Sequence, residues 1–263
     1  MVELQVIGGG RMGEALVGGL LHAGGRRIGD VRIVEPDADR RAVLAGIFPG
    51  VELAEVPGSA DGTVIAVKPG TVAAACRAAG ASGPGRVLSI AAGVTISALE
   101  AELPANTAVV RAMPNTPAVV GLAASAIAPG TSAGDGDLVW AESLLGAVGM
   151  VVRVEESLLD AVTGLSGSGP AYVFLIAEAL IEAGERSGLP LEVSRSLSIQ
   201  TLLGAATLLA KGGEGPEALR AAVTSPGGTT AAGLKILEQH GVRAAFLEAV
   251  AAATARSQEL GQP

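Results

Sequence analysis

The chain is poor in the residue types on which several classes of function depend. Its 263 residues include one cysteine, two histidines and 2% aromatic side chains, and the net charge is −8. With Cys76 alone, an intrachain disulfide and a cysteine-based metal site are excluded. Besides this cysteine, the chain has only His22 and His240 as typical zinc ligands, so a zinc site would have to be built mainly from carboxylates. We therefore expect no metal. Nucleic-acid binding needs a basic face and stacking aromatics, and this composition supplies neither.

The same absences bear on location. The first residues read as a short strand that runs directly into glycines, so we expect no signal or transit peptide. The longest uncharged stretch, residues 112–134, is interrupted by Pro114, Pro117 and Pro129, so we expect no membrane span there. We therefore expect a cytoplasmic protein that binds neither membrane nor nucleic acid.

Hydrophobic residues make up 49% of the chain, and their pattern changes near residue 155. Before that point short β-branched runs alternate with Ala-rich stretches, which predicts an α/β fold with a parallel sheet covered by helices. The predicted strands are residues 4–7, 31–34, 63–67, 87–90, 108–111, 125–127 and 150–154. After it, long helical patterns predict an all-α region. We therefore predict two domains, residues 1–155 and residues 156–263.

The predicted helix over residues 191–210 is unusual because it carries no charge from Ser196 to Ala210. A helix that is apolar on all sides must be buried on all sides. Two burial modes are open: wrapping by the four other helices of its own region, or an interface in which the helices of two chains interleave. The second is favoured, because a region of roughly 100 residues has little surface with which to bury such a helix alone.

A glycine motif follows the first predicted strand. It reads Gly8-Gly9-Gly10-Arg11-Met12-Gly13 and fits G-x-G-x-x-G, with a predicted helix over residues 11–21 behind it. The first glycines permit a tight turn and close approach to a pyrophosphate, which the amides at the helix start hold. The third allows the helix to pack on the sheet. This setting predicts a dinucleotide site rather than a chance turn, with cofactor-binding residues Gly8, Gly10, Arg11, Met12 and Gly13.

Glu35 ends the second predicted strand, where a carboxylate accepts hydrogen bonds from an adenosine ribose. Its charge repels a 2′-phosphate and so favours NADH over NADPH. Arg40 and Arg41 follow, and they either reach back to such a phosphate or form the solvated start of a helix. We expect NADPH or NADH as the cofactor, with the choice between them open.

Two further segments end predicted strands. One contains the only lysine in the first 200 residues and reads Ala66, Val67, Lys68, Pro69; the other contains Pro114 and Asn115. Ligands bind beyond the carboxyl ends of the strands in an open parallel sheet, so both segments should converge on the crevice of the glycine loop. Taken singly, Lys68 also fits a surface lysine, and Asn115 a loop-capping residue. We predict that both segments bind the cofactor.

The most specific segment precedes a predicted helix and reads Thr224-Ser225-Pro226-Gly227-Gly228-Thr229-Thr230. Bare backbone N–H groups at a helix start suit a small carboxylate, and the hydroxyls add neutral donors beside it. Equally, Thr229 or Thr230 is an ordinary N-cap and the glycines form a turn. The segment alone leaves both interpretations open.

Together these segments closely resemble those of the pyrroline-5-carboxylate reductases, over essentially the whole chain. The resemblance rests on residues 8–13, 66–69, 91–96, 113–117, 160–172 and 225–230, of which the last two are the most specific. It implies a Rossmann-type N-terminal domain, a helical C-terminal dimerisation domain and often a pentamer of dimers, that is, a homodecamer. It also implies NAD(P)H-dependent reduction of the cyclic imine 1-pyrroline-5-carboxylate to L-proline, the last step of proline biosynthesis.

The resemblance further implies a substrate-carboxylate loop formed by Ser225, Gly227, Gly228, Thr229 and Thr230. Thr230 would lie near the imine nitrogen, as orienting group or proton relay, and the loop would meet the partner chain's cofactor crevice. The residues of these motifs are consistent with a reductase, since they contain no His, Cys or Asp dyad for hydrolysis or acyl transfer. One departure concerns a loop in which the family often carries an adenosine-binding Asn: here the shortened loop reads Glu55-Val56-Pro57.

Two other functions stay open. One is another NAD(P)-dependent imine or β-hydroxy-acid reductase of the same architecture, and the β-hydroxy-acid enzymes need a catalytic lysine, for which Lys211 and Lys235 are available. Lys211 stands beside glycines at a predicted helix end, which is an ordinary capping position. The other is a non-catalytic dinucleotide-binding redox sensor. The intact segment from Ser225 to Thr230 argues against it, because a sensor needs no site for a carboxylate.

Overall fold

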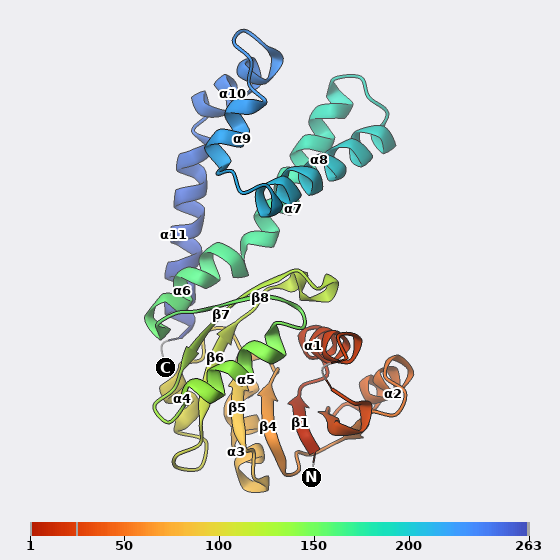
Figure 1. The fold of residues 1–263 in the computed structure, drawn as a ribbon, viewed down its shortest axis with the longest axis vertical. Helices are drawn as coiled ribbons and strands as arrows, with labels where there is room; N and C mark the ends of the chain where they lie inside the picture. The colour runs from red at the N-terminus through yellow and green to blue at the C-terminus, as the bar shows by residue number, and fades with distance from the viewer. Residues whose placement is uncertain (1, 25, 262–263) are drawn as a thin grey trace. The chain divides into compact units, whose positions relative to one another are not determined.

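Strands and helices alternate up to Arg153, and helices alone follow (Figure 1). The computed structural model describes residues 2–24 and 26–261. It divides into two compact units, residues 1–168 with 251–263 and residues 169–250, and each is described by itself. The predicted domains, residues 1–155 and 156–263, are a division by function and stay a prediction.

The first unit contains an eight-stranded sheet among its described residues, in the order β3-β2-β1-β4-β5-β6-β7-β8. Its strands are β1 (Val2–Ile7), β2 (Val31–Val34), β3 (Glu52–Ala54), β4 (Ala60–Ile65), β5 (Arg86–Ser89), β6 (Val109–Met113), β7 (Ala123–Pro129) and β8 (Gly149–Arg153). The chain order reverses between β1 and β4, which is where open sheets of this kind bind ligands. The predicted α/β fold with a Rossmann-type sheet is confirmed.

The sheet is parallel, as predicted, except at one pair of strands, which the sequence did not reveal. β6 and β7 are antiparallel, with Ala112 opposite Ile127, whereas the other neighbouring strands in the described sheet are parallel. Only residues 114–122 connect them. A parallel connection needs a crossover of roughly a dozen residues or more, so this segment is too short to provide one.

Helices cover both faces of the sheet, so a ligand can reach the sheet only at its edge. On one face α1 (Arg11–His22), α2 (Ala38–Ile47) and α5 (Asp135–Leu145) bury Leu4 and Val6; on the other, α3 (Val72–Ser82) and α4 (Ile96–Glu100) bury Ile7. Val6 and Ile7 point to opposite faces because side chains alternate along a strand. Short 3₁₀ segments complete this unit: η1 (Ile28–Asp30), η2 (Pro69–Thr71), η3 (Thr116–Val120) and η4 (Glu156–Leu158).

The second unit is helical throughout its described residues. Its elements are α7 (Gly169–Arg186), α8 (Leu191–Lys211), α9 (Pro216–Ala222), α10 (Thr229–Gln239) and the start of α11 (Val242–Leu260). Helices α7 and α8 form a hairpin in which Ser194 Oγ donates to the carbonyl oxygen of Ile181 at 2.7 Å. A Cβ at Gly184 would lie 2.1 Å from that hydroxyl, so glycine is needed for the two helices to approach.

Helix α8 is not wrapped by the other helices of its own chain. Leu203 and Leu208 are 55% and 60% exposed, and α7 covers only part of the helix. The first of the two burial modes considered for this helix is therefore wrong. An exposed apolar surface of this kind marks an interaction site.

Candidate active site

The glycine loop is held tightly between two strands. The N–H of Gly8 donates to the carbonyl of Val34 at 2.8 Å. Gly8 has a φ of +107°, and a Cβ there would lie 2.5 Å from the carbonyl oxygen of Ala66. A Cβ at Gly13 would lie 2.1 Å from the carbonyl oxygen of Gly8. Glycine is thus required at the turn and again where α1 passes close to it, as the motif predicts.

The start of α1 leaves backbone N–H groups for a ligand. Gly10 is the N-cap of this helix and carries no side chain, and a Cβ added there would meet no atom within 4 Å. The first N–H groups of a helix have no partner inside it. The side chain of Met12 packs on the core beneath the sheet, so its backbone alone is available, whereas Arg11 is exposed. These residues fit the pyrophosphate of a dinucleotide.

A cavity of about 480 Å³ opens beside this loop, at the ends of β1, β2 and β4. It brings together six of the predicted cofactor-binding residues: Gly8, Gly10, Glu35, Ala66, Val67 and Lys68. Much of its wall is apolar, with a few charged groups among the lining residues, which suits a ring that stacks on aliphatic groups and a ribose that accepts polar contacts. The cavity therefore fits the adenosine half of a dinucleotide.

Part of the cavity wall escaped prediction. Thr71, Ala74, Ala75 and Ala78 line it from η2 and the first two turns of α3. In the sequence these alanines read as helix core, because nothing in an alanine distinguishes a ligand-facing position from a packed one. The only signal is their place directly after the turn at Lys68. The backbone carbonyl of Lys68 accepts from both the N–H and the Oγ1 of Thr71, each at 2.9 Å, which orients this turn.

Glu35 stands where the sequence predicts a ribose-binding carboxylate. It follows β2 directly, and its N–H donates to the carbonyl of Ala54 at 2.9 Å. Its Oε2 accepts from the N–H of Gly9 at 3.0 Å, and its Oε1 accepts from the N–H of Asp37 at 3.0 Å. Backbone donors on two sides thus fix the carboxylate against the glycine loop.

Pro114 and Asn115 follow β6 and do not line this cavity. The side-chain amide of Asn115 donates to the carbonyl of Ser166 at 2.9 Å, and its Oδ1 accepts from the N–H of Ala124 at 2.9 Å. These contacts with backbone groups match the interpretation of Asn115 as a loop-capping residue. A direct contact of Pro114 or Asn115 with the cofactor stays a prediction.

The segment that Asn115 contacts contains a π-helical turn. Helix α6 (Leu159–Val162) runs into π-helical residues Thr163–Gly167, and a Cβ at Gly167 would lie 2.4 Å from the Cε of Met113 at the end of β6. Asp160 accepts from Ser257 Oγ at 2.6 Å, which ties this segment to the end of α11. Single π-helical turns often mark functional sites, and this one lies within residues 160–172, one of the two most specific segments of the family resemblance.

The segment from Ser225 to Thr230 lies in the second unit, where residues 225–228 form a turn and Thr229 and Thr230 begin α10 as exposed residues. The N–H of Gly228 donates to the carbonyl of Ser225 at 3.0 Å, and Gly227 has a φ of +73°. Gly228 is the N-cap, and no side chain among the described residues caps the helix. The alternative that Thr229 or Thr230 is the N-cap is therefore wrong. Their amides and hydroxyls are available to a carboxylate.

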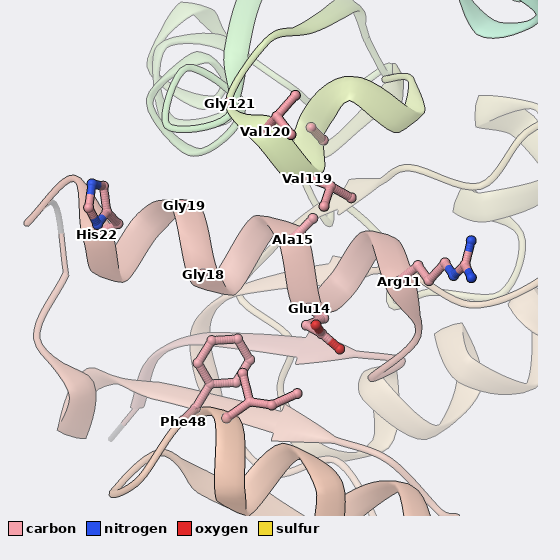
Figure 2. A pocket seen from close by; sticks show the side chains of 12 residues that line it. Arg11, Glu14, Ala15, Gly18, Gly19, His22, Phe48, Val119, Val120 and Gly121 are labelled. Atoms are coloured by element: carbon pink, nitrogen blue, oxygen red, sulfur yellow. The ribbon is translucent and has the colours of Figure 1, made fainter. Parts of the chain in front are cut away.

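A second cavity, of about 680 Å³, lies along α1 and was not predicted by any motif. Figure 2 shows Arg11 and His22 near opposite ends of the helix, with Val119 and Val120 on one side of it and Phe48 on the other. Its lining along α1 includes Gly18 and Gly19, and a Cβ at Gly19 would lie 2.3 Å from the side chain of Val148, so glycine is needed there for packing. Arg11 is the predicted site residue that faces this cavity.

No cluster of three or more His, Cys, Asp or Glu side chains able to hold a metal occurs in the described part of the chain. Residues Glu156–Arg186 form a stretch that is long and apolar enough to cross a membrane by length and composition alone. Its apolar window is only 6% buried within the chain.

Comparison with known proteins covers the whole chain. A family model described as pyrroline-5-carboxylate reductase dimerisation matches residues 156–260, and one described as NADP oxidoreductase, coenzyme F420-dependent, matches residues 3–93. The pyrroline-5-carboxylate reductase of Synechocystis sp. is 42% identical over 99% of this chain and 99% of its own length.

Two solved structures extend this similarity to the fold. A pyrroline-5-carboxylate reductase from Coxiella burnetii has a TM-score of 0.93 at 36% identity, covering 100% of this chain and 99% of that one. The Plasmodium falciparum pyrroline carboxylate reductase, with NADP bound, has a TM-score of 0.84 at 28% identity, covering 99% and 98%.

Proposed function

The chain belongs to the pyrroline-5-carboxylate reductase family, as its sequence motifs predict, and we propose that it reduces 1-pyrroline-5-carboxylate to L-proline with NAD(P)H. The observation that carries the proposal is the exposed start of α10, which no side chain caps and where Thr229 and Thr230 offer backbone N–H groups beside their hydroxyls. A small carboxylate is the ligand that such a helix start suits best.

The first unit supplies the cofactor site. The amides at Arg11, Met12 and Gly13 hold the pyrophosphate, and Gly10 keeps the space above the helix start open. Lys68 adds positive charge near the ends of β1 and β4, which counteracts the overall charge of −8. A bound nicotinamide supplies the hydride, so the protein need only position the imine and manage one proton.

The second unit supplies the substrate site. The carboxylate of the substrate accepts from the N–H groups of Thr229 and Thr230, with the Ser225 hydroxyl beside it, while the N–H of Gly228 holds the turn by donating to the Ser225 carbonyl. The Thr230 hydroxyl then lies within reach of the ring nitrogen, where it orients the imine or passes it a proton as the amine forms. In this proposal the loop of one chain meets the cofactor site of its partner.

The partner is a second copy of the chain. Exposed leucines on α7 and α8, among them Leu175, Leu203 and Leu208, give the apolar surface that an interleaved dimer buries, and the dimerisation model matches the same region. We assign this surface to protein rather than to lipid, and we propose assembly of such dimers into a homodecamer. The single cysteine, buried as a free thiol, is in keeping with a cytoplasmic location.

The other reductase considered from the sequence is less well supported. A β-hydroxy-acid enzyme needs a catalytic lysine, but Lys211 is the last residue of α8 and Lys235 lies in the middle of α10, away from the uncapped helix start. A redox sensor, for its part, has no use for a carboxylate site at residues 225–230.

Replacing the Thr230 hydroxyl tests the proposal. In Thr230→Ala we expect kcat for 1-pyrroline-5-carboxylate to fall by at least about tenfold, while the Kd for the dinucleotide stays unchanged. Thr230→Ser retains the hydroxyl and should recover much of the activity. Unchanged turnover in Thr230→Ala would remove this residue from the mechanism, and a rise in the dinucleotide Kd would place its role in cofactor binding instead.

A further inference from the structure

The two arginines beside Glu35 are already engaged by the protein. The Nε of Arg40 donates to the carbonyl of Gly9 at 2.7 Å, and its guanidinium pairs with Glu14 on α1. The Nη1 of Arg41 donates to the carbonyls of Glu35 and Pro36, at 2.7 and 2.8 Å. Neither arginine lines the 480 Å³ cavity. In the structure these cations are therefore engaged with the protein instead of pointing into the cavity where a 2′-phosphate would lie.

The carboxylate itself is held where it faces the ribose. Glu35 lines the cavity together with Gly8 and Gly10, and both its oxygens are fixed by backbone N–H groups. Each carboxylate oxygen has about two acceptor sites, so one on each remains for ribose hydroxyls. A 2′-phosphate placed there would meet a fixed negative charge.

The remaining charges on the cavity do not offset this one. Its charged lining residues are Glu35, Glu55 and Lys68. Lys68 follows β4, which is separated from β2 by β1, so it lies on the far side of the glycine loop from the ribose position. Asp37 adds another carboxylate next to Glu35, although it is engaged in capping α2.

We propose that Glu35 makes this chain select NADH over NADPH. The inference rests on the proposed use of this cavity for the adenosine half of the cofactor. Two properties produce the selection: a carboxylate that the backbone holds in place to accept from the ribose, and arginines that the fold diverts from the 2′ position. A relative that is 28% identical to this chain was solved with NADP bound, so the shared fold does not itself exclude NADPH, and the proposed selection rests on these residues.

Direct binding of the two dinucleotides to the full-length protein tests this selection. We expect the wild type to bind NADH at least about tenfold more tightly than NADPH in titration calorimetry, because like charges in close contact oppose binding. In Glu35→Ser the ratio of the two Kd values should shift toward NADPH by at least about tenfold. Asp39→Ser removes a carboxylate from the exposed first turn of α2, outside the cavity, and should leave the ratio unchanged.

A purely structural role for Glu35 gives a different result. Because Glu35 also holds Gly9, its loss could loosen the glycine loop, but that would weaken both dinucleotides equally. Glu35→Gln keeps an acceptor oxygen and removes the charge, so we expect its ratio to shift in the same direction as that of Glu35→Ser. NADPH binding by the wild type as tight as NADH binding, or an unchanged ratio in both variants, overturns the inference. Failure of the wild type to bind either dinucleotide overturns the proposed function itself.

Discussion

The side-chain amide of Asn115 donates a 2.9 Å hydrogen bond to the carbonyl oxygen of Ser166, 51 residues further along the chain. The same side chain accepts from the N–H of Ala124. One residue thus joins the end of β6, the start of β7 and the π-helical turn. Asn115 is therefore a positioning residue for the glycine-rich segment that the family resemblance marks as specific.

Removing this amide should cost stability as well as activity. In Asn115→Ala, half-buried backbone groups at Ser166 and Ala124 lose their partners, and we expect the free energy of unfolding to fall by about 1–2 kcal/mol. Asn115→Asp keeps the acceptor for Ala124 and should lie between Asn115→Ala and the wild type. Urea denaturation measures the order, and equal stability of all three proteins would show that these contacts are not formed in solution.

Alanine substitutions at two glycines of the loop should have different effects, one on stability and the other on dinucleotide binding. Gly8→Ala places a Cβ against the carbonyl of Ala66 at a positive φ, so we expect it to destabilise the protein by more than about 2 kcal/mol. A Cβ at Gly10 meets open space, so Gly10→Ala should change stability by at most about 1 kcal/mol. It should nevertheless weaken dinucleotide binding, because the methyl group occupies ligand space. Unchanged NADH affinity in Gly10→Ala would place the pyrophosphate elsewhere.

The exposed surface of α8 should hold the dimer together. Leu203 is 55% exposed in the single chain, and Leu203→Glu places a charge on this apolar surface. We expect light scattering after gel filtration to show a smaller assembly than the wild type forms. Val43→Glu introduces the same charge at an exposed valine on α2 and should leave the assembly intact. An unchanged mass for Leu203→Glu would exclude α8 from the interface.

The buried thiol on α3 should give a pH-dependent term in stability. Burial, with a smaller effect of Glu102, raises the pKa of Cys76 from its ordinary value of 9.0 to about 11. Because the pKa is raised in the folded state, this stability is fully present below pH 9 and is lost between pH 9 and pH 11. The loss reaches roughly 2–3 kcal/mol.

Other groups titrate in the same range, so Cys76→Ala is the control for this term. We expect urea denaturation to show a steeper decline for the wild type than for Cys76→Ala above pH 9. Parallel stability curves for the two proteins would contradict a raised pKa. Iodoacetamide should also modify Cys76 slowly in native protein at pH 8 and rapidly in urea, since the reactive form is the thiolate.

Elements with strong local signals were predicted well from the sequence. The β-branched runs identified β1 and β2, and the glycine spacing placed the turn and the start of α1. By contrast, β3 was missed because its residues, Glu52–Ala54, form a three-residue edge strand without β-branching. The antiparallel pair β6–β7 was also missed, since strand direction depends on connection length rather than on the strand residues.

Site residues were harder to predict, because their roles depend on partners that are distant in sequence. The sequence left the fate of Arg40 open, and its contacts with Gly9 and Glu14 exist only once α1 and α2 pack together. Asn115 was predicted to border the cofactor, but its partners lie 9 and 51 residues away. The α10 N-cap falls on Gly228 rather than on a threonine, because the turn at Ser225 begins the helix one residue earlier.

The most direct test of the proposed reaction follows the hydride from the dinucleotide into the product. Purified protein is incubated with 1-pyrroline-5-carboxylate and NADH deuterated at the transferring position, and the products are analysed by mass spectrometry. We expect proline that carries one deuterium at the former C=N carbon, formed in step with NADH consumption. Dinucleotide oxidation without proline, or no oxidation dependent on this imine with either NADH or NADPH, would contradict it.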